Sequence, residues 1–238
     1  MARLARLYVP GIPQLALVQL ATPLARPADP TPADWLDKLR DWLHTYARNY
    51  RVAVHGWVLL PDRLALLATP PDKTALSKVI QALGRRLAAD QKQGTVFAGR
   101  YHSALVQPGE WLLPCLVWLE SLPVAFHYVD TPTRWPWSSA QEHVGLAGTS
   151  PSLVTDHPDY WHCGNTPFAR QANYKAYLTQ GLASGTQAHI QATLLGQWAL
   201  GDDHFLNAIG PRATRRVAPA PRGRPRKRTR TVQSRTNT

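Results

Sequence analysis

The order in which strand-length and helix-period apolar segments alternate restricts the fold of this chain more than any other feature. Four apolar runs have the length of strands: 14–21, 52–60, 64–69 and 101–106. Three segments repeat apolar residues at intervals of three and four, as amphipathic helices do: 33–49, 74–91 and 110–122. The order strand, helix, strand, strand, helix, strand, helix predicts an α+β fold, a ferredoxin-like antiparallel sheet with helices packed on one face.

The turn between the second and third runs indicates how they pair. Pro61, Asp62 and Arg63 separate the two runs, which predicts an antiparallel hairpin with a short turn. Beyond Val129 the chain is rich in loops, with two further helices expected at 168–182 and 187–198.

The chain divides into three parts by composition. We expect a core domain at 1–130, a loop and helical C-terminal extension of that domain at 131–210, and a basic tail at 211–238. The tail lacks apolar periodicity and is dense in Pro, Arg and Thr, which predicts disorder without a partner.

Positive charge is concentrated in the tail. The formal net charge is +12, and residues 211–238 hold 10 basic side chains and no acidic one. Residues 1–210 hold 17 Lys and Arg against 15 Asp and Glu, so they are nearly neutral. A nucleic acid is the first class of partner that such a charge indicates, and an anionic membrane surface is the alternative.

Cysteine usage and hydropathy point to a cytoplasmic protein. Cys115 and Cys163 are the only cysteines, so a disulfide framework does not support the fold. Pro10, Gly11 and Pro13 interrupt the apolar N-terminal run and make it a poor signal peptide, and no run is long enough to span a bilayer.

Several sequence blocks resemble the REP-associated tyrosine transposases, a bacterial branch of the single-tyrosine HUH transposases. The blocks are 6–14 (RLYVPGIPQ), 54–61 (VHGWVLLP), 83–86 (LGRR), 94–101 (GTVFAGRY), 135–139 (WPWSS) and 223–227 (GRPRK). They occur in the family's order and extend over nearly the whole chain. The resemblance implies a protein that cuts and rejoins single-stranded DNA beside hairpins, with a tyrosine nucleophile and a divalent metal such as Mg²⁺.

The resemblance also implies that the metal site is absent here. In the family, two histidines flanking a hydrophobic residue hold the metal, within a Pro-Asn-His-hydrophobic-His-Leu-Leu pattern that aligns with residues 61–67. Arg63 and Ala65 stand at the histidine positions. A guanidinium stays protonated and cannot ligate a metal, and alanine has no donor atom.

The remaining catalytic positions are replaced as well. The family's segment around the nucleophile aligns with residues 117–126, where Trp118 stands for the tyrosine and Leu122 for the asparagine that is the third metal ligand. Tryptophan has no ionisable hydroxyl with which to form a covalent phosphodiester. A shifted alignment would need another His-x-His, and the nine histidines include no such pair.

We therefore expect a catalytically inactive DNA-binding protein without a metal, which recognises single-stranded or hairpin DNA. The alternatives are an active transposase or nickase with a rearranged site, and a protein-interaction module with nonspecific DNA affinity. As partners we expect DNA and no membrane, with an active homologous transposase as a further candidate, and we expect a nucleoid-associated location in the cytoplasm.

Six residues of the core are candidate DNA ligands. Arg85, Arg86, Arg100 and His102 lie in segments that the resemblance places near the DNA path, with ordinary surface charge as the alternative. Arg63 and Trp118 are expected to share the former catalytic pocket, where Arg63 would bind a phosphate without a metal and Trp118 would stack on a base.

The tail resembles an AT-hook, an extended Arg-Gly-Arg-Pro segment that lies in a narrow minor groove. Its candidate DNA ligands are Arg222, Arg224, Arg226, Lys227 and Arg228. A nonspecific cationic tail is the alternative. The cluster 157–163 holds two histidines and a cysteine, but its spacing fits no structural zinc pattern, so we expect a loop there.

Overall fold

The computed structural model describes residues 5–26, 29–92, 94–146 and 152–219. The strands are β1 (Gln14–Gln19), β2 (Ala53–Leu60), β3 (Arg63–Thr69), β4 (His102–Val106) and β5 (Ala199–Leu200). The helices are α1 (Ala33–Asn49), α2 (Ala75–Gln91), α3 (Leu112–Glu120), α4 (Leu122–Ala125), α5 (Ala140–His143), α6 (Pro158–Trp161), α7 (Pro167–Gln180), α8 (Ser184–Gly196) and α9 (Asp203–Ile209). Two short 3₁₀ helices follow α4 and α9: Pro132–Arg134 and Gly210–Arg212.

These strands form one mixed sheet in the order β2-β3-β1-β4-β5. The first four strands are antiparallel, and β5 pairs parallel to β4. With α1 and α2, the first four strands have the order and pairing of the expected ferredoxin-like unit. The α+β prediction is confirmed, and β5 is an addition that the sequence did not indicate.

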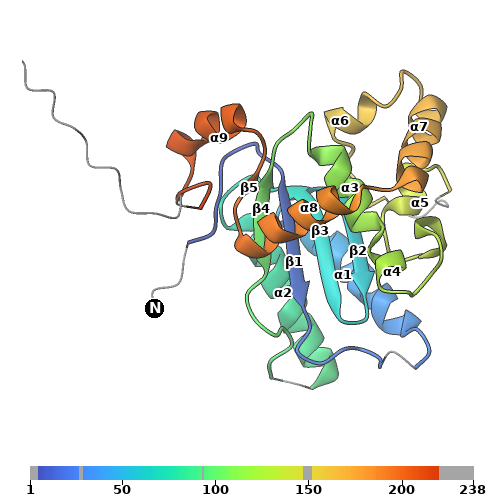
Figure 1. The fold of residues 1–238 in the computed structure, drawn as a ribbon. Coiled ribbons are helices and arrows are strands. Elements are labelled where there is room, and N and C mark those ends of the chain that lie inside the picture. Colours follow the sequence, from blue (N-terminus) through green and yellow to red (C-terminus); the bar gives the residue numbers. More distant parts are fainter. Residues whose placement is uncertain (1–4, 27–28, 93, 147–151, 220–238) are drawn as a thin grey trace, which may run out of the picture.

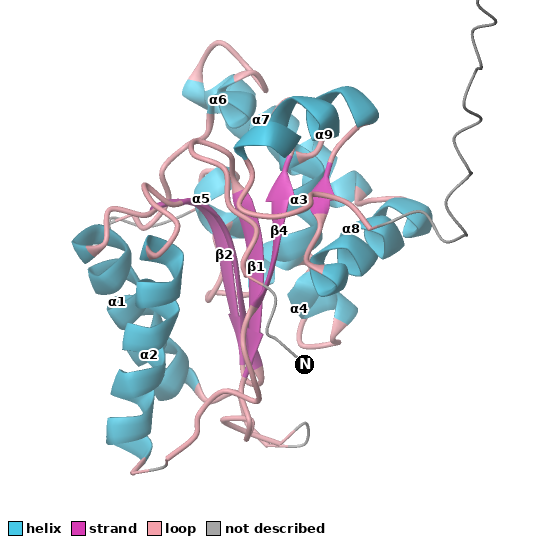
Figure 2. Ribbon diagram, turned by 90° about the vertical axis from the view of Figure 1, so that its left-hand side faces the viewer, coloured by secondary structure: helices cyan, strands magenta, loops and turns pink. Residues whose placement is uncertain are grey.

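Helices cover both faces of the sheet, where we expected one. α1 and α2 lie on one face, as predicted, while α3 and α8 lie on the other (Figures 1 and 2). The composition of β3 explains the second layer, because Leu64–Ala68 are all buried instead of alternating between buried and exposed. A strand that is apolar on both sides must be covered on both sides.

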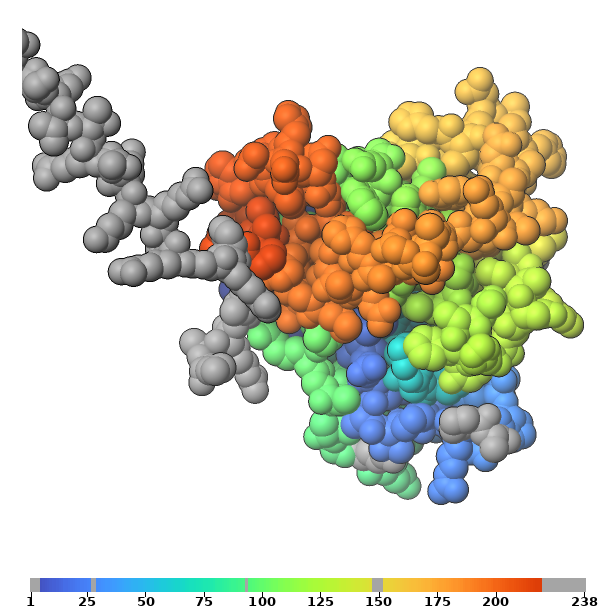
Figure 3. Space-filling model, in the orientation of Figure 1, coloured from blue at the N-terminus to red at the C-terminus, as the bar shows by residue number. Residues whose placement is uncertain are grey.

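The second layer comes from the part of the chain that follows β4. In the space-filling view, α8 and the segments around α3 and α4 cover most of this face of the sheet (Figure 3). The helices expected at 168–182 and 187–198 are α7 and α8, each shifted by a few residues. The helix expected at 110–122 is broken into α3 and α4, since Pro123 has no N–H to continue the helix.

The beginning of the predicted tail is folded. The Thr214 amide donates to the Tyr8 carbonyl (3.2 Å), and the Ala199 amide donates to the Val217 carbonyl (2.9 Å). Val217 and Ala213 also pack against a small apolar cluster that includes Leu7. The prediction of a disordered tail from residue 211 is therefore wrong for 211–219, and residues 220–238 lie outside the described part of the chain.

Candidate functional site

Arg63 and Ala65 lie on β3 with their side chains on the same face of the sheet, because residues two apart on a strand share a face. Gly56 of β2 is on this face too, and a Cβ there would overlap Leu116 of α3. The positions that align with the two metal-binding histidines therefore face α3, the helix that carries the aligned nucleophile position.

Arg63 has its charge neutralised within the protein. Its Nε donates to Asp62 Oδ1 (3.0 Å), and its Nη2 lies 2.5 Å from Asp62 Oδ2. The guanidinium carbon lies 3.9 Å from the ring centroid of Phe126, directly after α4, and the side chain is only 16% exposed. A phosphate that binds the Nε and Nη2 edge of Arg63 must therefore displace Asp62.

Trp118 and Leu122 lie on the helical side of the same region. Trp118 is 8% exposed and Leu122 is 7% exposed, so both side chains belong to the core. Leu122 begins α4 and does not continue the helix of Trp118, contrary to our expectation. A base needs an exposed indole face for stacking, and little of the Trp118 indole is exposed.

The donor set at these four positions does not fit a metal ion. Arg63, Ala65 and Leu122 contribute no imidazole, thiolate or carboxylate, and carboxylate or imidazole ligands are what Mg²⁺ and Zn²⁺ require. Among the described residues, no three His, Cys, Asp or Glu side chains come together as a metal site would need.

The other expected DNA ligands are spread over different surfaces. Arg85 and Arg86 are exposed on α2, on the opposite side of the sheet from Arg63, and Arg86 lies over the Trp42 ring (5.3 Å). His102 opens β4 opposite Leu17, on the face of Ala65, and its buried Nδ1 has no hydrogen-bond partner among the described residues. The ligands expected at 222–228 lie outside the described residues.

His55 lies away from Arg63 and Ala65 on the hairpin. It lies at a β-bulge near the far end of the hairpin from Arg63. Nδ1 donates to the Thr155 carbonyl (2.8 Å), and Nε2 accepts from the Thr69 hydroxyl (2.8 Å), the tautomer that this pattern of partners requires. Burial lowers the pKa of His55 to about 4.

A buried polar network around Glu120 was not predicted from the sequence. Glu120 ends α3, is fully buried, and accepts hydrogen bonds from the Ser139 hydroxyl (2.6 Å), His143 Nδ1 (2.6 Å) and the Tyr174 hydroxyl (2.8 Å). Ser139 Oγ also accepts from the Trp57 amide (3.0 Å), so the network ties β2 to α3, α5 and α7.

The charge of His143 follows from this network. Burial is the strongest single influence and lowers its pKa, but the carboxylates of Glu120, Asp156 and Glu142 together outweigh burial and raise the pKa above its ordinary value. The ring packs against Tyr160 (4.9 Å between centroids) and Tyr174 (5.1 Å), and its buried Nε2 has no partner among the described residues. Removing one partner of such a buried ion pair lowers the free energy of unfolding by about 3–5 kcal/mol, because the other charge is left without a partner.

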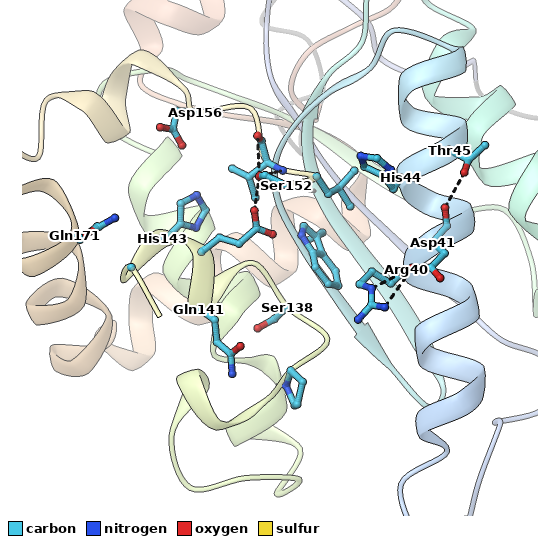
Figure 4. A pocket seen from close by; sticks show the side chains of 16 residues that line it. Arg40, Asp41, His44, Thr45, Ser138, Gln141, His143, Ser152, Asp156 and Gln171 are labelled. Carbon is cyan, nitrogen blue, oxygen red and sulfur yellow. Dashed lines mark hydrogen bonds and ion pairs between the residues drawn. The ribbon is translucent and has the colours of Figure 1, made fainter. Parts of the chain in front are cut away.

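A cavity of about 730 Å³ lies beside β2. Arg40 and His44 of α1 line one wall, and Ser138, Gln141 and His143 line the other (Figure 4). This cavity is separate from the face of Arg63 and Ala65, because its strand residue is Trp57, whose side chain points to the side of α1 and α2.

Charged groups in this cavity are mostly paired with one another. Arg40 contacts Asp37 (3.0 Å) and Asp41 (3.2 Å), and Glu142 accepts a hydrogen bond from Ser152. The cavity therefore presents mixed, internally satisfied charges and no excess of positive charge for a polyanion.

The segment 157–163 forms a helical turn, α6, where we expected a loop. His157 Nδ1 accepts a hydrogen bond from the Asp159 amide (3.1 Å), and Asp159 accepts one from the Gly109 amide (2.6 Å). These side chains cap the turn and fasten it to the loop before α3.

In the described part of the chain, no helix is long and apolar enough to cross a membrane.

Comparison with known proteins yields a likeness of fold. No protein-family model and no curated protein matches the sequence. A solved structure of a REP-associated tyrosine transposase bound to a REP hairpin is similar in fold, with a TM-score of 0.51 and 18% sequence identity. The likeness covers 66% of this chain and 95% of that one.

Proposed function

We propose that this chain is a DNA-binding protein of transposase-like fold that recognises single-stranded or hairpin DNA and does not cut it. The observation that carries the proposal is the likeness of fold to a transposase whose structure contains a DNA hairpin. The concentration of basic side chains in residues 211–238 supports it independently, since cationic segments supply most nonspecific affinity for phosphates.

Loss of cleavage is proposed from the chemistry of four positions. Arg63 and Ala65 supply no metal ligand, Leu122 supplies none either, and Trp118 supplies no hydroxyl nucleophile. Cleavage of a phosphodiester needs a nucleophile and groups that stabilise the transition state. A protein of the same fold without them can bind DNA but not cut it.

Candidate DNA ligands fall into three groups. Arg63, Trp118 and His102 belong to the face that α3 covers, the arginines at 85 and 86 lie on α2, and the arginine at 100 precedes Tyr101, which contacts Ser77 of α2. The basic residues at 222–228 form the third group. For Arg63 the proposal includes an exchange of partners, in which a phosphate replaces Asp62.

One assay tests both halves of the proposal. A labelled hairpin oligonucleotide with a single-stranded flank is incubated with the protein and Mg²⁺ or Mn²⁺, and binding, nicking and covalent attachment are measured together. We expect binding without nicking. Nicked product or a covalent protein–DNA adduct would contradict inactivity, and absence of binding would contradict DNA recognition.

A truncated protein separates recognition by the folded part from affinity of the tail. Residues 1–219 keep the C-terminal segment that packs beside Tyr8, so they preserve the described fold. We expect this fragment to retain a preference for the hairpin over an unstructured strand of equal length, with a flatter salt dependence. An equal affinity for both would indicate a tail with only nonspecific affinity.

A further inference from the structure

A recess of about 640 Å³ lies where the beginning of α2 meets the N-terminal segment of the chain. Its walls include Arg6, Lys73 and Lys78, together with the hydroxyl residues Thr74 and Ser77. No acidic residue is among those that line it. Three cations from two separate segments therefore converge on one hollow.

The cations of the recess are not paired with carboxylates. Among the described residues, no Asp or Glu oxygen lies within 4 Å of the charged nitrogens of Arg6, Lys73 or Lys78. Arg6 lies over the Tyr101 ring (3.9 Å), and its buried Nε has no hydrogen-bond partner in the described structure. A half-buried cation without a counter-charge favours binding of an anion.

Arg100 adds to the positive potential. Arg100 is the residue before Tyr101, whose ring Arg6 covers, so it lies close to the recess, and its charge acts with burial to lower the pKa of Arg6. Arg100 is one of the residues that the sequence indicated as a DNA ligand. The structure therefore brings it near cations that the sequence analysis did not single out.

The carboxylate of Asp72 caps α2 and interacts with the charge of Lys78 without forming an ion pair, so it offsets only part of the charge of the three cations. It accepts hydrogen bonds from the amides of Thr74 (2.6 Å) and Ala75 (3.1 Å) and from the Thr74 hydroxyl (2.6 Å). The site therefore depends on side-chain cations and not on the helix terminus. The hydroxyls of Ser77 and Tyr101 share one hydrogen bond (3.0 Å), which leaves the second hydroxyl hydrogen available for a ligand.

We propose that this recess binds phosphate groups of a DNA backbone. The proposal deepens the proposed function, on which it rests, by assigning the contact to the α2 side of the sheet, away from Arg63 and the former catalytic face. A single small phosphate would not use the whole surface. Lys78 and Arg85 are exposed and seven residues apart, so they lie on one side of α2 and extend the positive surface beyond the recess.

The position of the C-terminal segment supports a polymeric ligand. Thr214 also lines the recess, and its hydroxyl donates to the Arg6 carbonyl (2.7 Å). The chain then continues to Arg215 and Arg216. A strand of DNA in the recess would lie next to the start of the basic segment.

The test compares two variants of the full chain that each lose two positive charges. One is Lys73→Ala with Lys78→Ala, in the recess. The control is Arg48→Ala with Lys175→Ala, two exposed residues on α1 and α7. Binding to the hairpin oligonucleotide with a single-stranded flank is measured between about 50 and 200 mM salt. A thermal melt of each variant checks that it is folded.

We expect the recess variant to bind less tightly and with a weaker salt dependence. Two lost phosphate contacts lower the slope of log K against log salt by about 1.4 for a single strand, equivalent to about 25-fold in affinity at about 0.1 M salt. The control is expected to keep the wild-type slope. Inorganic phosphate is expected to compete no better than chloride of equal ionic strength.

The outcomes distinguish this proposal from the proposed function. If the wild type does not bind the hairpin, DNA recognition itself is refuted. If the wild type binds and the recess variant has an unchanged slope, or the control loses as much, only the recess is refuted. Tight competition by inorganic phosphate would refute the assignment to a DNA backbone and indicate a small-anion site.

Discussion

Acidification should destabilise the fold through His55, and the size of the effect follows from its environment. The ring is 5% exposed and contacts Thr155 and Thr69, and its burial favours the neutral form although the hydrogen bond to the Thr155 carbonyl acts in the opposite direction. Its pKa in the folded state is about 4, against an ordinary value of 6.5. Because the folded pKa is lowered, the stabilisation is fully present above pH 6.5 and is lost as the pH falls toward 4.

The magnitude comes from the difference between the two pKa values. A separation of 2.5 pH units corresponds to about 3 kcal/mol once both states are protonated, and at pH 5 the loss is about 2 kcal/mol. Protonation also places a hydrogen on Nε2, where the Thr69 hydroxyl now donates, so that hydrogen bond must be rearranged.

The assay is urea unfolding of the wild type and of His55→Asn at pH 7.5 and pH 5. The variant loses stability at both pH values, but it has no imidazole to titrate at this position. His143 and His157, which also face this region, remain in both proteins, so only the part of their titration that depends on the charge of His55 differs between them. If both proteins lose the same free energy between the two pH values, the argument from His55 is refuted.

Three further substitutions follow from the site geometry. Asp62→Asn should raise hairpin affinity about five-fold at about 0.1 M salt if Arg63 becomes free for one phosphate, and an equal rise in Asp130→Asn, which removes the acidic partner of Arg134, would argue against this. Tyr174→Phe removes one hydrogen bond to the buried carboxylate of α3 and should lower the free energy of unfolding by about 1.5–3 kcal/mol, with a value below the error of the unfolding curve contradicting the network. Gly56→Ala should cost about 1–3 kcal/mol because the added methyl overlaps a leucine of α3, and a stability like that of the wild type would mean that the helix can shift.

Periodicity was sufficient to predict the elements that are long and one-sided. α1 and α2 carry repeated apolar residues, and each end of both helices lies within one residue of the end expected from the sequence. β5 was missed because two residues contain no period, and it forms only through pairing with β4. The second helical layer was not predicted, because the sequence pattern shows which faces of an element are apolar but not which helix packs on each face.

Side-chain partners distant in the sequence were beyond prediction. One signal for the Glu120 network was present, since Glu120 is the one acidic residue in an otherwise apolar helix and a buried carboxylate needs partners. Its partners Ser139, His143 and Tyr174 come from two other helices or their ends, and only the tertiary structure brings them together. Arg63 is the converse case, because its partner was the preceding residue in the printed sequence.

The pairing of β4 with β5 affects how the chain folds during synthesis. The register joins Leu105 to Ala199, so one edge of the sheet remains open while the intervening residues emerge from the ribosome. Contacts of such long sequence separation form late and slow the overall folding rate. An unpaired strand edge is also a template for association with other chains. Nascent or C-terminally interrupted copies of this protein should therefore aggregate more readily than the finished chain, and sedimentation of a fragment that ends before β5 measures that tendency directly.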